Sequence, residues 1–295
     1  MNVLLAEYTT LHDPLLAPEG AAMLAVLEQS FRRCGYTVVK PGHGDFGAEI
    51  ERIAPACDMG LVIAPDHLLS RYTQILEQHT HNLGCGFMPA ALCANKVSTE
   101  KILRSHALRV PAGISAGKKV IKPIKGSGAD RVRISEALPG KDEFSQQYIE
   151  GEPFSVSLVA SRVVGDACLF FSGKPPLVLA VNRQFIEAGP EGALRYLGGE
   201  TPVHPAREEE MIRTAIKSVE VLGCQGYCGV DMVVSDDIYV VDVNPRITTS
   251  LVGIAACMEE EIAHILVAAS KGGAPDHVHL TGSVRFDTGG KITPV

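Results

Sequence analysis

The sequence lacks an excess of basic residues, and this shortage argues against a nucleic acid as the main partner. Its 295 residues include 27 Lys and Arg but 34 Asp and Glu, a formal net charge of -7. Binding to a phosphate backbone needs a dense surface of Lys and Arg, which this composition does not supply. We therefore expect small-molecule partners and no nucleic acid.

Long apolar runs and paired cysteines are also missing. No run approaches the roughly 20 apolar residues of a membrane-spanning helix, and the stretch MNVLLAE, residues 1–7, has no basic segment like that of a signal peptide. The cysteines show neither the C-x-x-C pairs of a zinc site nor the density of a disulfide scaffold. We expect a cytoplasmic protein without a membrane partner, and reduced, mostly buried thiols. The cysteines are Cys34, Cys57, Cys85, Cys93, Cys168, Cys224, Cys228 and Cys257.

Three signatures of common enzyme classes are absent as well. The sequence contains no G-x-x-x-x-G-K-[ST] of a Walker-type nucleotide site, no H-E-x-x-H of a zinc protease and no G-x-S-x-G of a serine hydrolase. What is present is length and apolar content, because 46% of the residues are hydrophobic. This is enough for a large core and about two domains.

The first ninety or so residues alternate strand and helix patterns. Apolar or β-branched runs at 3–6, 37–39 and 59–64 indicate strands, and a helical periodicity covers 19–34. This order predicts a parallel α/β layer, in which ligand groups gather where strands end. The polar residues at such ends are either in solvated loops or in a substrate site. They are Glu7, Tyr8 and Asp66.

The remainder of the chain predicts a mixed architecture, α/β at first and α+β in the C-terminal part. A helix is expected to begin near residue 95, a strand at 120–123 and antiparallel sheet over 144–185. The periodicity of 207–222 predicts a helix that stops at Gly223. A last helix is expected over roughly 259–269.

The stretch VVDVNPRITTS, residues 240–250, places a carboxylate and an amide at the end of an apolar strand. If Asp236 and Asp237 form a two-residue hairpin loop, Ser235 faces Ile238, Val234 faces Tyr239, and Asp231 lies opposite Asp242. Asn244 then projects from the same face as Asp242. The alternative is that the two acids cap strand ends in solvent, and a one-residue change in the loop would place them on opposite faces.

Two facing carboxylates among valines call for a cation between them, because like charges directly opposite on neighbouring strands are destabilising. Oxygen ligands from Asp231, Asp242 and Asn244 suit Mg²⁺, with Mn²⁺ as a substitute. Pro245 ends the strand, which leaves Arg246 able to reach the same site as a counter-charge for phosphate.

A polar glycine loop, KGSG, follows the strand at 120–123. The backbone N–H groups of Gly126, Ser127 and Gly128 can approach phosphate oxygens, and Lys122 and Lys125 add positive charge. An ordinary turn between two strands is the alternative explanation of the same residues.

Six motifs occur in one order along the chain, and together they resemble the ATP-grasp ligases. They are ANK at 94–96, VIKP at 120–123, KGSG at 125–128, QQYIEGE at 146–152, GVD at 229–231 and DVNPR at 242–246. The resemblance implies an N-terminal Rossmann-like α/β domain at 1–92, a small central lid at 93–145 and a C-terminal antiparallel-sheet domain with a metal site at 146–295. It implies ATP and magnesium as cofactors.

The resemblance also implies roles for individual residues. Lys96 and Lys122 would contact ATP, Asp231, Asp242 and Asn244 would bind metal, and Arg183, Arg246 and Lys125 would contact the transferred phosphate. The adenine and ribose contacts would come from Gln146, Gln147, Ile149 and Glu152. The sequence departs from the family pattern at two positions. The second metal-binding acid, here Asp242, is more often Glu, and the first residue of the adenine-binding hinge, here Gln146, is also more often Glu. Arg183 could instead be a surface strand residue.

The activity implied is the joining of a carboxylate, activated as an acyl-phosphate, to an amine with release of ADP and phosphate. Within the family, the sequence most resembles the tyramine–glutamate ligases of archaeal methanofuran synthesis. This closer resemblance rests on Glu7 and Tyr8, EGAAML at 19–24, NRQ at 182–184 and DVNPRITTS. Alternatives are another acid and amine pair, a kinase, or a regulatory ATP-binding module. The sequence does not decide the oligomeric state, and a homodimer is one state it allows.

Overall fold

The N-terminal part of the computed structural model, which describes residues 1–125, 131–161 and 174–295, is a parallel α/β layer. Its sheet has the order β2-β1-β3-β4, and Leu5 of β1 pairs with Leu61 of β3. The strands are β1 (Asn2–Glu7), β2 (Thr37–Val39), β3 (Met59–Ile63) and β4 (His81–Asn82). The helices are α1 (Thr9–His12), α2 (Ala17–Arg33), α3 (Phe46–Ile53), α4 (Asp66–Glu77) and α5 (Phe87–Cys93), with the 3-10 turn η1 (Ala54–Ala56). The predicted parallel layer is confirmed.

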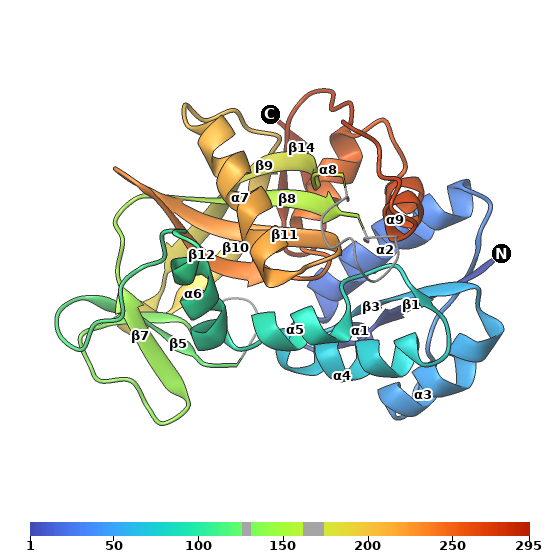
Figure 1. The fold of residues 1–295 in the computed structure, drawn as a ribbon, viewed down its shortest axis with the longest axis horizontal. Coiled ribbons are helices and arrows are strands. Elements are labelled where there is room, and N and C mark those ends of the chain that lie inside the picture. The colour runs from blue at the N-terminus through green and yellow to red at the C-terminus, as the bar shows by residue number, and fades with distance from the viewer. Residues whose placement is uncertain (126–130, 162–173) are drawn as a thin grey trace.

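A small antiparallel sheet of order β6-β5-β7 follows helix α6 (Lys96–Ser105). Helix α6 begins at Lys96 because the side chain of Asn95 accepts a hydrogen bond from the N–H of Ser98 at 3.1 Å. The strands are β5 (Lys119–Pro123), β6 (Arg133–Ser135) and β7 (Glu143–Gln147). In Figure 1 this lid sheet stands at the opposite end of the molecule from the parallel layer. The predicted boundary between residues 145 and 146 falls inside β7.

The largest sheet has seven antiparallel strands in the order β12-β11-β8-β9-β10-β13-β14. The strands are β8 (Glu152–Ala160), β9 (Leu177–Ala188), β10 (Leu194–Thr201), β11 (Gly226–Val234), β12 (Ile238–Asn244), β13 (Val284–Asp287) and β14 (Ile292–Pro294). Its helices are α7 (Glu208–Leu222), α8 (Ser250–Cys257) and α9 (Ile262–Ser270), and η2 (Pro190–Gly192) is a single turn. The predicted stop of α7 is confirmed, since Gly223 has a φ of +68°.

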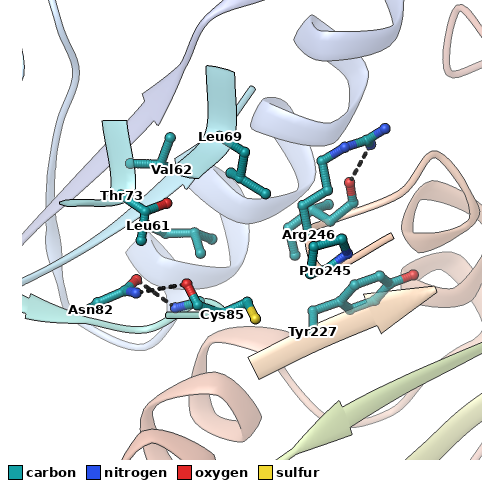
Figure 2. Close-up of a pocket in the computed structure, with 11 residues that line it drawn as sticks. Leu61, Val62, Leu69, Thr73, Asn82, Cys85, Tyr227, Pro245 and Arg246 are labelled. Carbon is teal, nitrogen blue, oxygen red and sulfur yellow. Dashed lines mark hydrogen bonds between the residues drawn. The ribbon is translucent and has the colours of Figure 1, made fainter. Parts of the chain in front are cut away.

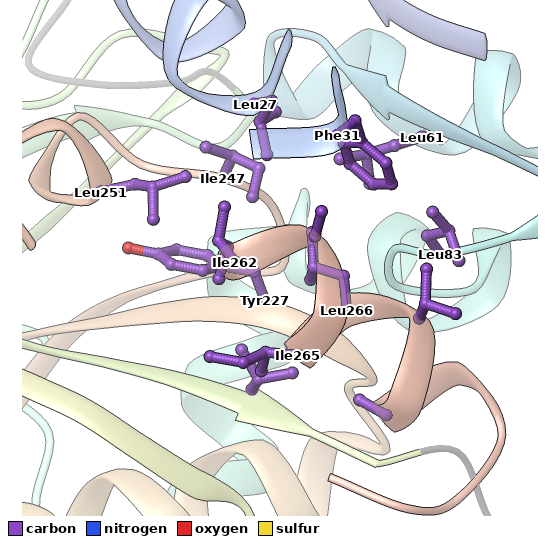
Figure 3. Packing of buried hydrophobic residues seen from close by; sticks show 14 of the residues in the cluster. Leu27, Phe31, Leu61, Leu83, Tyr227, Ile247, Leu251, Ile262, Ile265 and Leu266 are labelled. Atoms are coloured by element: carbon purple, nitrogen blue, oxygen red, sulfur yellow. The ribbon is translucent and has the colours of Figure 1, made fainter. Parts of the chain in front are cut away.

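One hydrophobic core joins the parallel layer to the large sheet. Leu27 and Phe31 of α2, Leu61 of β3, Leu266 of α9 and Tyr227 of β11 all belong to it, and Figure 3 shows them packed around α9. A second core lies on the other face of the large sheet, beneath α7. Because these cores are shared between layers, the layers hold fixed positions relative to one another.

None of the helices in the described parts of the chain combines the length and the apolar character that a bilayer crossing requires.

The shared core predicts that the layers unfold together. We expect Leu266→Ala to lower the free energy of unfolding by about 2 to 5 kcal/mol, because it deletes a fully buried side chain. Leu138→Ala removes the same atoms from a side chain that is 74% exposed and should change it by less than about 0.5 kcal/mol. Chemical unfolding followed by circular dichroism measures both, and two separate transitions in the Leu266 variant would contradict the unfolding of the layers as one unit.

Candidate active site

The hairpin of β11 and β12 places Asp231 directly opposite Asp242, as predicted. The turn itself differs from the prediction, because Val234 pairs with Ile238 and not with Tyr239. The loop therefore has three residues, 235–237, and the N–H of the first donates to the carbonyl of the third at 2.9 Å. The predicted two-residue loop of Asp236 and Asp237 is wrong.

A β-bulge at Val241 restores the pairing of the acids. Met232 pairs with Val240 and Asp231 with Asp242, so β12 carries one extra residue between these pairs. The carbonyl of the bulged Val241 accepts a hydrogen bond from the ammonium group of Lys122 at 3.0 Å. The bulge thus corrects the register and also attaches the lid strand β5 to the large sheet.

Amide groups surround the carboxylate of Asp231. Asn244 Nδ2 donates to Asp231 Oδ2 at 3.0 Å, and Gln184 Nε2 donates to Asp231 Oδ1 at 2.9 Å. Burial and the charge of Asp242 raise the pKa of Asp231 to about 6, although these hydrogen bonds lower it. The carboxyl group is therefore easier to protonate than an ordinary aspartate.

Two buried lysines face the same acids. The ammonium group of Lys96 forms an ion pair with Asp242. Burial alone would raise the pKa of Asp242, but Lys96 and Lys122 outweigh it and hold that pKa below its usual range. Burial lowers the pKa of Lys122 to about 8. The site therefore gathers two carboxylates and two ammonium groups, and among the described residues the carboxylate of Asp231 has no ion-pair partner.

This donor set fits a hard divalent cation. Two carboxylates and an amide oxygen are the ligand types of Mg²⁺ and Mn²⁺, and rotation of the Asn244 amide by half a turn directs Oδ1 where Nδ2 now points. Within the described residues, no group of three or more His, Cys, Asp or Glu could hold a metal ion by itself. A cation between Asp231 and Asp242 would thus depend on Asn244 and on ligands from outside the chain.

A polar group without a partner lies beside the lysines. Gln146 is buried, its Nε2 donates to Glu100 Oε2 at 3.2 Å, and its Oε1 has no hydrogen-bond partner in the described part of the chain. A small pocket here is lined by Lys96, Thr99, Glu100, Leu103, Val110, Phe144, Gln146, Val240, Val241 and Asp242. A ligand with an N–H group at this pocket would satisfy the acceptor.

The neighbouring hinge residues have less specific surroundings. The N–H of Gln147 donates to the carbonyl of Ala112 at 2.7 Å, and its side chain is exposed. Ile149 is half-buried and Glu152 is exposed. Lys125 is exposed at the end of the described residues of this region. The predicted phosphate loop of Gly126, Ser127 and Gly128 lies outside the described residues.

Arg246 connects this site to the parallel layer. Its Nε donates to Asp66 Oδ1 at 2.9 Å, and its Nη1 donates to the carbonyl of Ile247 at 3.2 Å. Burial alone would lower the pKa of Arg246, but Asp66, Glu19 and Asp242 together raise it. Figure 2 shows Arg246 and Pro245 at a pocket whose other side is formed by β3 and α4. The side chain is therefore fixed beside the acids rather than directed to solvent.

The strand ends of the parallel layer are buried. Glu7 and Asp66 are 2% and 3% exposed, so the explanation as solvated loops is wrong for both. The carboxylate of Glu7 accepts hydrogen bonds from the N–H groups of Thr9 and Thr10 at 2.9 and 2.8 Å. Tyr8 is half-buried and stacks on His12 with ring centroids 4.8 Å apart.

Arg183 lies away from the site. Its neighbour Gln184 reaches Asp231, and side chains alternate along a strand, so Arg183 projects from the other face of β9. There it is 47% exposed, lies over the ring of Phe154 and pairs with Glu152 at 3.3 Å. The structure does not bring Arg183 to the acids.

Several polar residues at the site were not predicted from the sequence. Thr249 donates a hydrogen bond to Glu19 of α2, and Tyr196 of β10 lies close enough to Asp231 for that charge to influence its pKa. Gln184 is a further contact. Glu19 lies in EGAAML, and the three hydroxyl residues at 248–250 follow DVNPR after Ile247. These segments were the signal available in the sequence.

A family model described as the ATP-grasp domain matches residues 93–250. Tyramine–L-glutamate ligase of Methanocaldococcus fervens is 32% identical over 215 residues, which are 71% of this chain and 65% of that protein. The enzyme of the same name from Methanocaldococcus jannaschii is 31% identical over 202 residues, 67% of this chain and 58% of the relative. The chain thus spans less than two thirds of the length of either relative.

Among solved structures, an ATP-grasp superfamily protein from Archaeoglobus fulgidus is similar over nearly the whole chain. It is 28% identical, with a TM-score of 0.76, and the match covers 97% of this chain and 92% of that one. The match therefore includes the parallel layer, the lid sheet and the large sheet.

The unequal environments of the two acids predict opposite effects of two similar variants. The raised pKa of Asp231 means that its ionisation costs stability, a cost that appears as pH rises from about 4 through 6. Asp231→Asn should therefore stabilise the unliganded protein at pH 8 and have little effect near pH 4.5. Partial exposure of the carboxyl group limits the gain at pH 8 to about 2 kcal/mol.

Asp242→Asn should destabilise the protein at pH 8, because it leaves the buried ammonium group of Lys96 without its partner. Urea unfolding of both variants at the two pH values measures these effects. Loss of stability in both variants at pH 8 would contradict the assignment of the ion pair to Asp242.

Proposed function

The chain belongs to the ATP-grasp family, and we propose that it is an ATP-dependent ligase that joins a carboxylate to an amine and releases ADP and phosphate. The observation that carries the proposal is the cluster of Asp231, Asp242 and Asn244 beside the buried Lys96 and Lys122. The pair of substrates best supported is L-glutamate and tyramine, which the names of the two relatives give. The product would be γ-glutamyltyramine, as in methanofuran synthesis.

The nucleotide would lie between the lid sheet and the large sheet. Gln146 has a buried acceptor that no described residue satisfies, which suits the amino group of adenine. Gln147 and Ile149 would contact the base through backbone groups, and Glu152 the ribose. When bound, ATP supplies the phosphoryl group that activates the carboxylate, and Mg²⁺ neutralises phosphate charge. Asp231, Asp242 and Asn244 would hold the ion.

The side chains would contribute position and charge rather than covalent chemistry. The ammonium group of Lys96 forms an ion pair with Asp242. If Asp242 held a metal ion, Lys96 would be available to a phosphate oxygen. Lys122 is held at the β12 bulge, close to the charges of Asp231 and Asp242. Arg246, fixed by Asp66, would face the transferred phosphate. Phosphoryl transfer requires this kind of placement and no nucleophilic side chain.

Two predicted phosphate contacts have unequal support. Lys125 is exposed and leads into the predicted glycine loop, so we retain it as a contact made when the lid closes and excludes water. Arg183 projects from the face of β9 opposite to Asp231, so we give it no role in phosphoryl transfer.

The metal assignment predicts a loss of turnover without a loss of fold. We expect Asp242→Ala and Asn244→Ala each to lower ATP turnover by at least about a hundredfold, because each removes an oxygen that positions the phosphate charge. Asp236→Ala, at an exposed position of the same hairpin, should keep normal turnover. Coupled assay of ADP release, with circular dichroism as the check on folding, decides the matter; normal turnover in either ligand variant would remove the metal assignment.

The adenine assignment predicts a change in base preference. In Gln146→Leu the acceptor for the adenine amino group is lost, so KM for ATP should rise about tenfold, the order of one buried hydrogen bond. KM for GTP, whose base has a carbonyl at that position, should not rise. Gln147→Leu changes an exposed neighbour and should leave both values unchanged. Equal effects of Gln146→Leu on the two nucleotides would contradict adenine recognition by Gln146.

The overall reaction is tested by measuring ADP and phosphate with Mg²⁺-ATP, L-glutamate and a panel of amines that includes tyramine. Release of both products only when glutamate and tyramine are present supports the proposal. Turnover with another acid and amine would replace the substrates and keep the ligase. ADP without free phosphate would indicate a kinase, and ATP binding without turnover would indicate a regulatory module.

A further inference from the structure

Four thiols that are scattered in the sequence meet beneath the active site. Cys85 follows β4, Cys93 ends α5, Cys224 follows α7 and Cys228 lies in β11, three residues before Asp231. All four are buried in the core beneath α7. The expectation of reduced, buried thiols is confirmed for them, whereas Cys168 lies outside the described residues.

Cys224 is the centre of this thiol cluster. Its sulfur is 3.7 Å from that of Cys93, and the thiols of Cys85 and Cys228 lie close enough to influence its protonation. The neighbouring thiols and burial raise the pKa of the Cys224 thiol well above its usual range, so the proton stays on this sulfur. In the described part of the chain, the cluster does not have the arrangement of a metal site.

A small pocket reaches the cluster from the active-site side. Cys85 lines it together with Tyr227, Pro245 and Arg246, and Figure 2 shows Cys85 beside Pro245 and Tyr227. A molecule of the size of water fits here and meets the cluster at Cys85, which shares its buried core with Cys93 and Cys224, whereas a peptide thiol or glutathione is too large. The oxidant that suits this cluster is therefore a small hydroperoxide.

We propose that the thiol cluster is a site of reversible oxidation, at which hydrogen peroxide converts Cys93 and Cys224 to a disulfide. The sulfur of Cys93 attacks one peroxide oxygen, which becomes part of a sulfenic acid, while hydroxide leaves and takes up the proton of the Cys93 thiol. The sulfur of Cys224 then attacks that of Cys93, its proton goes to the departing hydroxide, and a second water forms. Two thiols and one peroxide thus give one disulfide and two waters.

The bond would change the geometry of the active site. A disulfide needs the two sulfurs about 2.05 Å apart, so the end of α5 and the segment before β11 must approach each other. Lys96 follows Cys93 by three residues, its N–H donates to the carbonyl of Ile124 in the lid at 3.1 Å, and its ammonium group pairs with Asp242. Because the interior is close-packed, the movement is transmitted to Lys96.

Peptide mapping tests the disulfide independently of any activity. The protein is treated with hydrogen peroxide, its remaining thiols are alkylated, and it is digested with chymotrypsin without reductant. Cleavage after Phe87 and Tyr227 separates Cys85 from Cys93 and Cys224 from Cys228. We expect a linked pair of peptides containing Cys93 and Cys224, absent from Cys93→Ala and retained in Cys257→Ala, which alters a buried thiol outside the cluster.

A linkage between other cysteines would overturn the pairing. Modification of the partly exposed Cys34 while Cys93 and Cys224 remain reduced would overturn the site as a whole.

The effect on catalysis rests on the proposed ligase function. Oxidation should lower kcat/KM for ATP by about tenfold, since a displacement of about 1 Å at a positioning group can cost up to a hundredfold. Dithiothreitol should restore it, and Cys93→Ala should be insensitive to peroxide. A mapped disulfide without any change in ATP turnover would overturn the coupling to Lys96, whereas absence of turnover before oxidation would count against the ligase function alone.

Discussion

The structure depends on how two facing carboxylates are kept inside the protein. Asp231 and Asp242 lie on neighbouring strands, where their charges repel each other. Lys96 relieves one of them and amide groups hold the other, so the pair retains an unequal distribution of charge. This unequal distribution suits a site that receives a divalent cation together with an anionic ligand. The cation would neutralise the carboxylate of Asp231, and the anionic ligand would supply the remaining oxygen ligands of the cation.

The groups around the acids come from all three layers. Lys96 begins α6, Lys122 lies on the lid strand β5, and Arg246 is held by Asp66 of the parallel layer. Each contact crosses from one layer to another, so the site exists only when the layers have packed. The shared hydrophobic core supplies that packing, with α9 between the parallel sheet and the large sheet.

Much of this arrangement follows from the sequence. The β-branched runs predict the parallel strands, and the alternation around Asp231 and Asp242 predicts that they face each other. The three-residue loop and the compensating bulge do not follow, because each depends on contacts such as that of Lys122 with Val241. Helix α8 was missed since it is apolar on nearly all sides and has no helical periodicity. Gln184 and Glu19 belong to distant segments that only the packing brings to the site.

The measurement that tests the central claim most directly is calorimetric titration with a non-hydrolysable ATP analogue, with and without Mg²⁺, at pH 5 and pH 8. If the facing acids hold the metal-bound nucleotide, Mg²⁺ should strengthen binding at pH 8. It should do so far less at pH 5, where Asp231, with its pKa of about 6, is mostly protonated. Binding that does not depend on Mg²⁺, or depends on it equally at both pH values, would contradict the account.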